Sequence, residues 1–406
     1  MAVCNRLDVF EFMELIDDLR LINFQFMWIK NLRLVLMALF TLSLHFGFAQ
    51  DEKAAAELKS IMTKRNVVGL AVAVVKDGKL IYAKSFGVKN IATNAPLTNE
   101  TMFRIASISK SFAATAIMQL LEAKKIGLED DFGKLVGFPV RNPKFPDRII
   151  TLKMVLSHTS SINDTEGYFN LDVINPAKNP NWEKCYNAYE PGEGYQYCNL
   201  NFNLTGAVIE KISGVRFDLY IKRQILDPLG LYAGYCVDSL DQTKFATLYE
   251  FDVSTQQFMA SPAAYNPRSE EIKSYKIGYQ TPIFSPTGGM KISATDLAKY
   301  MTVHLNYGKY GKGRLISRKS SKMMQTKQSD EESYGLALRS DTTLIAGETM
   351  VGHTGSAYGL YSAMFFNPKS KFGIVVITNG CKPTFSNGFC ETLSESINSL
   401  YRNFIQ

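Results

Sequence analysis

The chain contains a pair of residues whose spacing is typical of an activated nucleophile, Ser107 and Lys110 in Ser107-Ile108-Ser109-Lys110. Positions i and i+3 share one face of a helix, and large apolar residues recur at helical intervals over residues 111–121. We therefore expect both side chains in the first turn of a helix. Its positive end favours a developing alkoxide, and partial burial makes an ammonium lose its proton more readily. The alternative is a serine and a lysine on a solvated helix surface.

A serine–lysine nucleophile also needs a proton relay to the leaving group. The turn-rich segment 191–199 offers Tyr197 and Asn199, a phenol and an amide two residues apart. A phenol beside an ammonium can act first as a base and then as an acid. The same tyrosine–asparagine spacing recurs at 168–170 and 401–403, so a purely structural tyrosine is the competing interpretation.

Donors for an oxyanion are the remaining requirement, and residues 351–356, Val-Gly-His-Thr-Gly-Ser, could supply them. Small residues allow an edge strand to approach a substrate closely. Here His353 could hold a substrate carboxylate or tune the phenol. The Ser356 N–H could pair with the Ser107 N–H as an oxyanion hole. The alternative is an ordinary turn at the start of a strand.

The elements that must position these residues are predicted from hydrophobic patterns. Residues 51–64 read as a helix, and β-rich runs at 69–76 and 79–84 surround Asp77-Gly78, a strong hairpin signal. Further expected elements are helices at 200–212, 217–226 and 391–404 and strands at 360–366 and 372–378. Hairpins at both ends around a helical, loop-rich middle predict an α+β fold with one antiparallel sheet built from both terminal regions. A cleft between the sheet and the helical insertion is the expected site.

The N-terminal segment predicts export. An apolar run over residues 34–49 follows Lys30 and Arg33 and ends in small residues before Gln50, which is typical of a cleaved signal peptide. A membrane anchor is the alternative, but the run is shorter than the ~20 apolar residues that a span usually needs. Acidic residues crowd positions 1–26, so we interpret translation as starting at Met27, with 27–49 as signal peptide and 1–26 as a doubtful extension.

Composition limits the class of protein further. The 406 residues are 46% hydrophobic and 20% charged, which favours an ordered globular domain. The net charge of +7 is spread without an arginine-rich stripe, so we expect no nucleic-acid partner, whereas attraction to an anionic cell wall or membrane surface stays open. We expect no metal, because cysteines and histidines lack zinc spacing. Five cysteines follow the leader, so at least one is free, and sequence proximity favours Cys381 with Cys390 as a disulfide.

Three segments in this order, residues 103–110, 191–199 and 353–355, resemble the β-lactamase-related serine hydrolases. This group contains class C β-lactamases, D-alanyl-D-alanine carboxypeptidases, D-aminopeptidases and related esterases. Supporting matches lie at 156–160, 204–214 and 286–298, and the similarity runs from about residue 67 to residue 379. The resemblance implies a β-lactamase/transpeptidase-like fold, with an α/β part over about 50–123 and 287–406 and a helical lobe over about 124–286.

The resemblance also implies a serine acyl-enzyme mechanism without cofactor. Ser107 would attack, Lys110 and Tyr197 would handle its proton, and Asn199 would orient the substrate. The strand through His353, Thr354, Gly355 and Ser356 would line the cleft. The substrate would be a small molecule or peptide.

Three positions depart from the family pattern: His353 stands where β-lactamases have lysine, Cys198 separates Tyr197 from Asn199, and Ser161 replaces a glycine. The histidine looks more like peptidases and esterases of the group, so we expect ester or D-amino-acyl substrates before β-lactams. The alternative is a slowly deacylating penicillin-binding or sensing protein, or a non-catalytic scaffold. His158, in the 156–161 cluster, is interpreted as a buried structural residue.

Overall fold

The computed structural model describes residues 13–14, 50–329 and 331–406. The predicted extension and signal peptide fall outside these residues, apart from positions 13 and 14. The chain divides into two compact units, residues 1–56 and 57–406. In the first unit the described residues are helical, and residues 57–64 of the second continue as helix, in agreement with the expected helix at 51–64.

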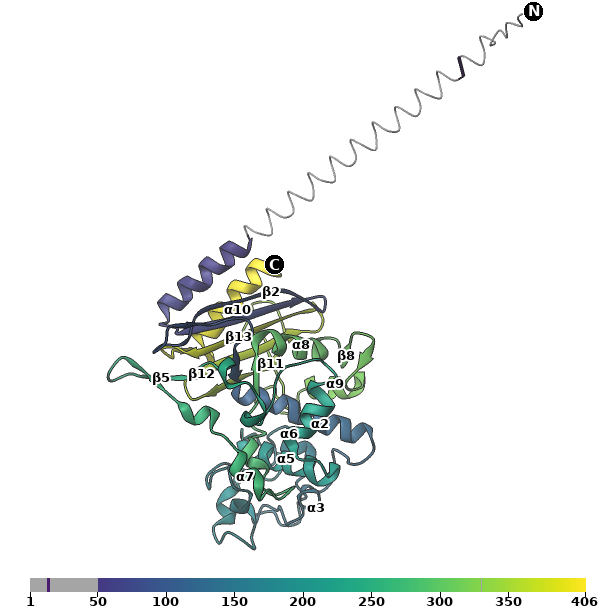
Figure 1. Ribbon diagram of the computed structural model, residues 1–406. Helices are drawn as coiled ribbons and strands as arrows, with labels where there is room; N and C mark the ends of the chain where they lie inside the picture. Colours follow the sequence, from purple (N-terminus) through teal and green to yellow (C-terminus); the bar gives the residue numbers. More distant parts are fainter. Residues whose placement is uncertain (1–12, 15–49, 330) are drawn as a thin grey trace, which may run out of the picture. The chain divides into compact units, whose positions relative to one another are not determined.

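A seven-stranded antiparallel sheet is the framework of the second unit (Figure 1). Its strand order is β10-β11-β12-β13-β1-β2-β3. The strands are β1 (Gly69–Lys76), β2 (Lys79–Asn90), β3 (Ala95–Pro96), β10 (Arg339–Asp341), β11 (Met350–Ala357), β12 (Leu360–Asn367) and β13 (Phe372–Gly380). Because β13 pairs with β1, the two terminal regions build one sheet. The predicted α+β class is confirmed.

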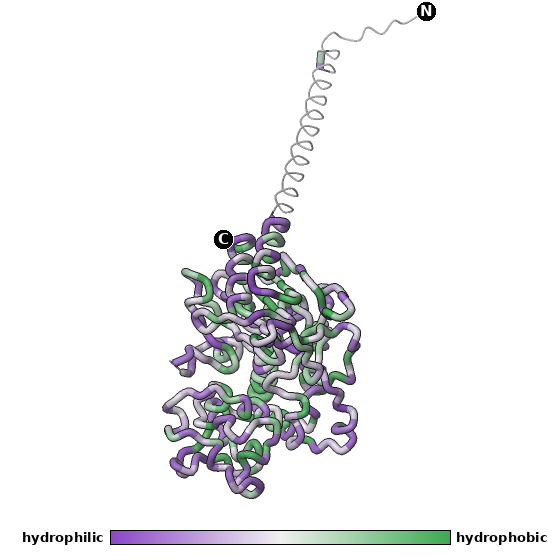
Figure 2. Tube along the Cα trace, turned by 90° about the vertical axis from the view of Figure 1, so that its left-hand side faces the viewer, coloured by the Kyte–Doolittle hydropathy of each residue, from purple (hydrophilic) through white to green (hydrophobic). Residues whose placement is uncertain are grey.

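Helices cover both faces of this sheet, which explains why β13 is buried along its whole length. The amphipathic α10 (Glu391–Phe404) packs on one face and α8 (Ala294–Leu305) on the other, the face turned toward α2 (Ser109–Glu122) (Figure 1). Figure 2 shows the alternation of hydrophilic and hydrophobic residues along α10. The Asp77-Gly78 turn has positive φ at both positions, as the hairpin prediction requires.

Between β4 (Met102–Arg104) and β7 (Lys291–Ser293) the chain forms helices and loops. The α-helices there, besides α2, are α3 (Phe132–Val136), α4 (Leu152–Leu156), α5 (Asn199–Ser213), α6 (Phe217–Ile221) and α7 (Ser269–Lys273). A π-turn (Lys222–Leu226) extends α6, and β5 (Tyr249–Asp252) and β6 (Gln257–Ala260) form a hairpin. The 3₁₀ turns are Ala106–Ile108, Leu171–Ile174, Trp182–Cys185, Val237–Ser239, Gln242–Lys244, Pro262–Tyr265 and Thr281–Phe284. The remaining elements are β8 (Lys309–Tyr310), β9 (Gly313–Arg314), α9 (Arg318–Gln325), β14 (Phe385–Ser386) and β15 (Phe389–Cys390).

The sheet holds the Ser107 turn through a close crossing with β11. A Cβ on Gly355 would lie 2.2 Å from the carbonyl oxygen of Ile105, so only glycine allows this approach. The Ser362 hydroxyl of β12 donates to the same carbonyl at 3.0 Å. The crossing is possible because β10 pairs only with residues 350–352 of β11, which leaves residues 353–357 open toward the turn.

We predict that Gly355→Ala lowers the free energy of unfolding by about 1–3 kcal/mol, since the methyl group must displace backbone or distort the turn. Chemical denaturation measures the loss. Gly234→Ala is the matched control, because its Cβ would meet nothing closer than 3.5 Å and its backbone is unstrained. Equal stabilities of the two variants would contradict the close crossing.

Candidate active site

Lys110 lies at the centre of the site, with its side chain 0% exposed. Its Nζ is 3.1 Å from Ser107 Oγ, 2.9 Å from Asn199 Oδ1 and 3.0 Å from the carbonyl oxygen of Thr287. The serine–lysine pair therefore belongs to a buried constellation, and the surface interpretation is wrong. We expected Ser107 in the first turn of the helix, but it lies in the 3₁₀ turn just before α2, which begins at Ser109 and contains Lys110 in its first turn.

The three oxygens around Lys110 suit both of its protonation states. An ammonium donates to all three. A neutral amine donates to the amide and carbonyl oxygens, which can only accept, and its lone pair accepts from the Ser107 hydroxyl. Burial lowers the pKa of Lys110 to about 7, with the Asp164 charge opposing that effect. The amine is thus a competent proton acceptor near neutral pH, and Ser107 can transfer its proton without rearrangement of the site.

Tyr197 lies beside this pair, with its ring centroid 4.7 Å from Lys110 Nζ. Burial raises the pKa of its phenol far above the usual range, while the nearby Ser107 hydroxyl opposes this effect through hydrogen bonding. The Tyr197 hydroxyl nevertheless has no hydrogen-bond partner with good geometry, so we treat Ser107 as a close neighbour rather than a bonded one. A phenol this reluctant to ionise is suited to donate or relay a proton, and Lys110 is the better initial base.

The tyrosine loop is held by His158, which is fully buried. Its Nδ1 accepts from the backbone N–H of Cys198 at 3.2 Å, and its ring packs 4.5 Å from the Tyr197 ring. Burial keeps the pKa of His158 well below its usual value. These contacts support the structural interpretation of His158.

Asp164 is the residue that sequence reasoning missed. Its carboxylate accepts from the backbone N–H groups of Asn199 and Leu200 at the start of α5, and from Asn199 Nδ2 at 3.0 Å. These bonds fix the amide so that its Oδ1 faces Lys110. A capping residue usually directly precedes its helix, whereas Asp164 is 35 residues before Asn199, so no local pattern could have identified it.

His353 lies on β11 and is neutral. Its Nδ1 contacts the Thr354 carbonyl oxygen, which can only accept, so Nδ1 carries the proton. Its Nε2 then accepts from the Tyr334 hydroxyl at 3.0 Å. Burial and the Lys110 charge lower the pKa of His353 to about 3. Of the two predicted roles, a charge partner for a substrate carboxylate does not fit this ring, which leaves an influence on Tyr197, 6.1 Å away between centroids.

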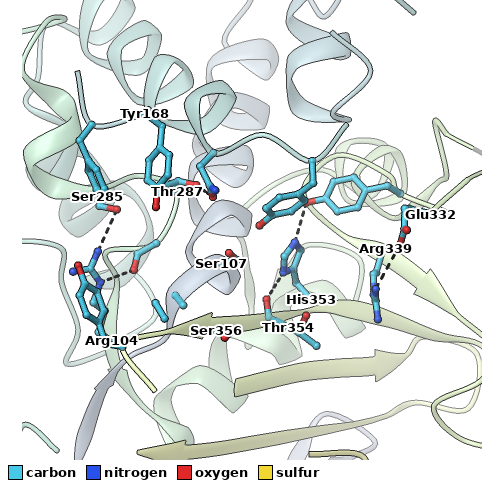
Figure 3. Close-up of a pocket in the computed structure, with 18 of the residues that line it drawn as sticks. Arg104, Ser107, Tyr168, Ser285, Thr287, Glu332, Arg339, His353, Thr354 and Ser356 are labelled. Carbon is cyan, nitrogen blue, oxygen red and sulfur yellow. Dashed lines mark hydrogen bonds and ion pairs between the residues drawn. The ribbon is translucent and has the colours of Figure 1, made fainter. Parts of the chain in front are cut away.

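One cavity of about 710 Å³ collects most of the predicted residues. Its lining includes Ser107, Tyr197, Asn199, His353, Thr354 and Ser356. Lys110 and Gly355 are buried and are not among the lining residues. The lining also contains residues that the sequence did not single out: Arg104, Ser285, Thr287, Glu332, Tyr334 and Arg339. Figure 3 shows Arg104, Ser285 and Tyr168 on one side of Ser107, with His353, Glu332 and Arg339 on the other.

The cysteines take no part in disulfides here. All five described cysteines, Cys185, Cys198, Cys236, Cys381 and Cys390, are free and buried. The expected Cys381–Cys390 disulfide is therefore absent, although a hydrogen bond joins the two thiols. Cys198 instead donates to Asp164 Oδ1 at 3.2 Å, so no cross-link distorts the Tyr197 loop.

No group of three or more histidine, cysteine, aspartate or glutamate side chains among the described residues could hold a metal ion. No helix in the same residues combines the length and apolar character needed to cross a bilayer.

The fold and the serine–lysine–tyrosine geometry are those of a β-lactamase-fold family of serine hydrolases. Residues 54–397 match the family described as Beta-lactamase, and the chain belongs to that family. It is 25% identical over 323 residues to Protein flp of Staphylococcus aureus (strain MRSA252), covering 78% of this chain and 60% of the relative. The chain thus spans about 60% of the length of the first curated relatives that it matches.

Solved structures agree with this family. The octameric penicillin-binding protein homologue from Pyrococcus abyssi superimposes with a TM-score of 0.67 at 27% identity, covering 86% of this chain and 78% of that one. EstCE1, a hydrolase with promiscuous acyltransferase activity, gives a TM-score of 0.69 at 19% identity, covering 86% and 99%, and shows likeness of fold alone.

We predict that Asp164→Asn moves the acidic limb of the pH–kcat/KM profile to lower pH, by about one pH unit. The Asp164 charge raises the pKa of Lys110, so removing it lowers that pKa further. The neutral amine then persists at lower pH, and activity falls later on acidification. Asp241→Asn is the matched control, since Asp241 also caps a short helical turn but is not among the charges that shift the pKa of Lys110. An unchanged midpoint, or a move to higher pH, would contradict the assignment of Lys110 as base.

Proposed function

We propose that this protein is a serine hydrolase that works through an acyl-enzyme intermediate. The observation that carries the proposal is the fully buried Lys110, whose Nζ lies 3.1 Å from Ser107 Oγ and whose pKa burial lowers to about 7. A lysine in this state can accept the serine proton at neutral pH, which is the step that converts an unreactive hydroxyl into a nucleophile.

The proposed mechanism has two steps, acylation of Ser107 and hydrolysis of the acyl-enzyme, and the same side chains act in both. Ser107 Oγ attacks the substrate carbonyl carbon while its proton passes to Lys110. Tyr197 then donates a proton to the leaving group, recovers one from Lys110, and the acyl group stays on Ser107. Water attacks the ester by the reverse route and frees the acid. Asn199 orients the acyl chain, and the N–H groups of Ser107 and Ser356 are proposed to bind the oxyanion.

Small esters and D-amino-acyl peptides are the proposed substrates, ahead of β-lactams. His353 occupies the place of the β-lactamase lysine, and its neutral ring lacks the fixed positive charge of that lysine. A slowly deacylating penicillin-binding or sensing protein is the second candidate, because the same groups would also form a stable acyl-enzyme.

The test uses a p-nitrophenyl ester, a D-Ala-D-Ala peptide and nitrocefin on the protein and on Ser107→Ala. We expect continuous turnover of the ester or peptide, and a loss of at least about 10³-fold in kcat/KM in the variant. Ser386→Ala, an exposed serine on β14, is the matched control and should keep full activity.

The other outcomes are equally informative. A burst of one equivalent without turnover would favour the sensing protein over the hydrolase. Turnover that survives Ser107→Ala would rule out Ser107 as the nucleophile.

We also propose that the protein is exported, with cleavage before Gln50, on the strength of the apolar run at 34–49. An association with the cell wall or a membrane surface belongs to this proposal. Expression of the full chain in a secreting host should yield mature protein whose N-terminal sequence begins at Gln50. Intact leader on intracellular protein would contradict export.

A further inference from the structure

A buried arginine at one end of the cavity carries an inference about the acyl group, and it rests on the proposed hydrolase function. Arg104 ends β4, three residues before the nucleophile, and lines the same cavity. Arg104 is buried, with only 7% of its surface exposed. Burying a guanidinium is costly unless hydrogen bonds or an opposite charge compensate it.

Arg104 has no carboxylate partner among the described residues. Its Nε donates to the carbonyl oxygen of Gly288 at 3.0 Å, and its two terminal nitrogens donate to the Ala264 carbonyl at 3.3 Å and to Ser285 Oγ at 3.4 Å. A guanidinium has five N–H donors. These three contacts leave two donors, and the whole positive charge, without an acidic acceptor.

The other arginines nearby are compensated. At the opposite end of the cavity, Arg339 pairs with Glu332 at 3.8 Å and with Asp341 at 3.5 Å. Arg268 pairs with Glu271 at 2.8 Å. Arg104 is therefore the unpaired arginine of this group, and the contrast lies within one molecule.

Arg268 is a second positive charge that acts on Arg104, whereas burial holds the pKa of Lys291 well below its usual value, so that Lys291 adds little charge. Lys291, directly opposite on β7, is buried as well and donates to the Tyr235 carbonyl at 2.6 Å. Glu250 lines the same cavity and Asp238 acts on Lys291, but neither forms an ion pair with Arg104, whose guanidinium lies 4.9 Å from the Tyr358 ring centroid. A cation covered by an aromatic ring and bonded to neutral acceptors keeps most of its capacity to bind an anion.

The position of Arg104 relative to the proton relay indicates which part of the substrate it meets. Tyr197, which protonates the leaving group, packs with Tyr334 and His353. Figure 3 places His353 on the opposite side of Ser107 from Arg104. With the leaving group directed toward the His353 end, the acyl chain extends toward Arg104, whose Cα is within about 10 Å of that of Ser107 along the chain.

We propose that Arg104 binds a carboxylate at the far end of the substrate's acyl chain, so that the enzyme prefers acyl groups derived from dicarboxylic acids. The planar guanidinium would use its free N–H donors in a charge-assisted, bidentate contact, with the Ser285 hydroxyl as a further donor. Arg104 is then a specificity residue of the acyl subsite.

The test compares p-nitrophenyl hemiesters of succinate, glutarate and adipate with the p-nitrophenyl esters of butyrate, valerate and hexanoate, which match them in chain length. In each reaction Ser107 takes the acyl group, p-nitrophenolate leaves, and water releases the acid. We expect kcat/KM for the best hemiester to exceed that of its neutral partner by about tenfold or more, as a charge-assisted hydrogen bond would provide.

Arg104→Gln should reduce this ratio to about one; the ratio is taken within each variant, so a general loss of activity cancels. Arg339→Gln removes the same charge at the other end of the cavity and should leave the ratio unchanged. Arg104→Lys, which keeps the charge but loses the planar fork, should retain part of the preference, and it replaces Arg104→Gln if that variant does not fold. Equal rates for hemiesters and neutral esters in the wild type, or a ratio lost only in Arg339→Gln, would overturn the proposal.

A binding measurement separates this proposal from the proposed function. Calorimetry with the Ser107→Ala protein compares glutaric acid monoanilide with valeranilide, neither of which needs turnover to bind. Tighter binding of the monoanilide that disappears in the Ser107→Ala, Arg104→Gln double variant supports the subsite even if no ester is hydrolysed, an outcome that would refute the hydrolase alone. Equal binding of both probes overturns the Arg104 proposal and leaves the hydrolase standing.

Discussion

The structure depends on keeping one amine out of water. Lys110 is fully buried, and an isolated ammonium in that position would be expensive to maintain. The cost is met by oxygens drawn from three distant parts of the chain: Ser107, Asn199 and the Thr287 carbonyl. Each belongs to a different element, so the buried amine links the turn before α2, the start of α5 and the loop before β7. The same burial that makes the lysine difficult to place also makes it basic in the useful range, because the charged form is the one that burial disfavours.

Residues that do not bond Lys110 directly also hold this arrangement in place. Asp164 caps α5 and orients the Asn199 amide, and its charge limits how far the pKa of Lys110 falls. Without that carboxylate, burial would act on Lys110 unopposed by its largest attractive partner. On the opposite side, Gly355 allows β11 to cross the nucleophile turn at a distance that no side chain would permit. The site is thus fixed between a capped helix and a sheet strand, which are rigid elements, and its groups are preorganised before substrate arrives.

The sequence alone predicted the elements and site residues that are encoded by local patterns. β-rich runs around the Asp77-Gly78 turn predicted β1 and β2, and helical spacing predicted α2, α5 and α10. Ordered motifs located Ser107, Tyr197 and His353 and the family. Contacts made across the fold were out of reach, because Asp164, Thr287 and Tyr334 act through hydrogen bonds to partners 19 to 177 residues away. The neutral state of His353 could not be predicted either, because it follows from burial in the fold and from the nearby Lys110 charge.

The roles of Lys110 and Tyr197 follow from how burial acts on groups of opposite charge type. In water the two have similar pKa values, so the residue types alone leave the base undecided. Desolvation disfavours the ammonium of Lys110 and the phenolate of Tyr197, which lowers one pKa and raises the other. Near pH 7 the neutral amine is therefore well populated beside a neutral phenol, which is the pair that the proposed mechanism needs, with Lys110 accepting and Tyr197 donating. One shared environment separates the two pKa values and thereby favours Lys110 as the base and Tyr197 as the acid, and it does so before any substrate contributes a charge.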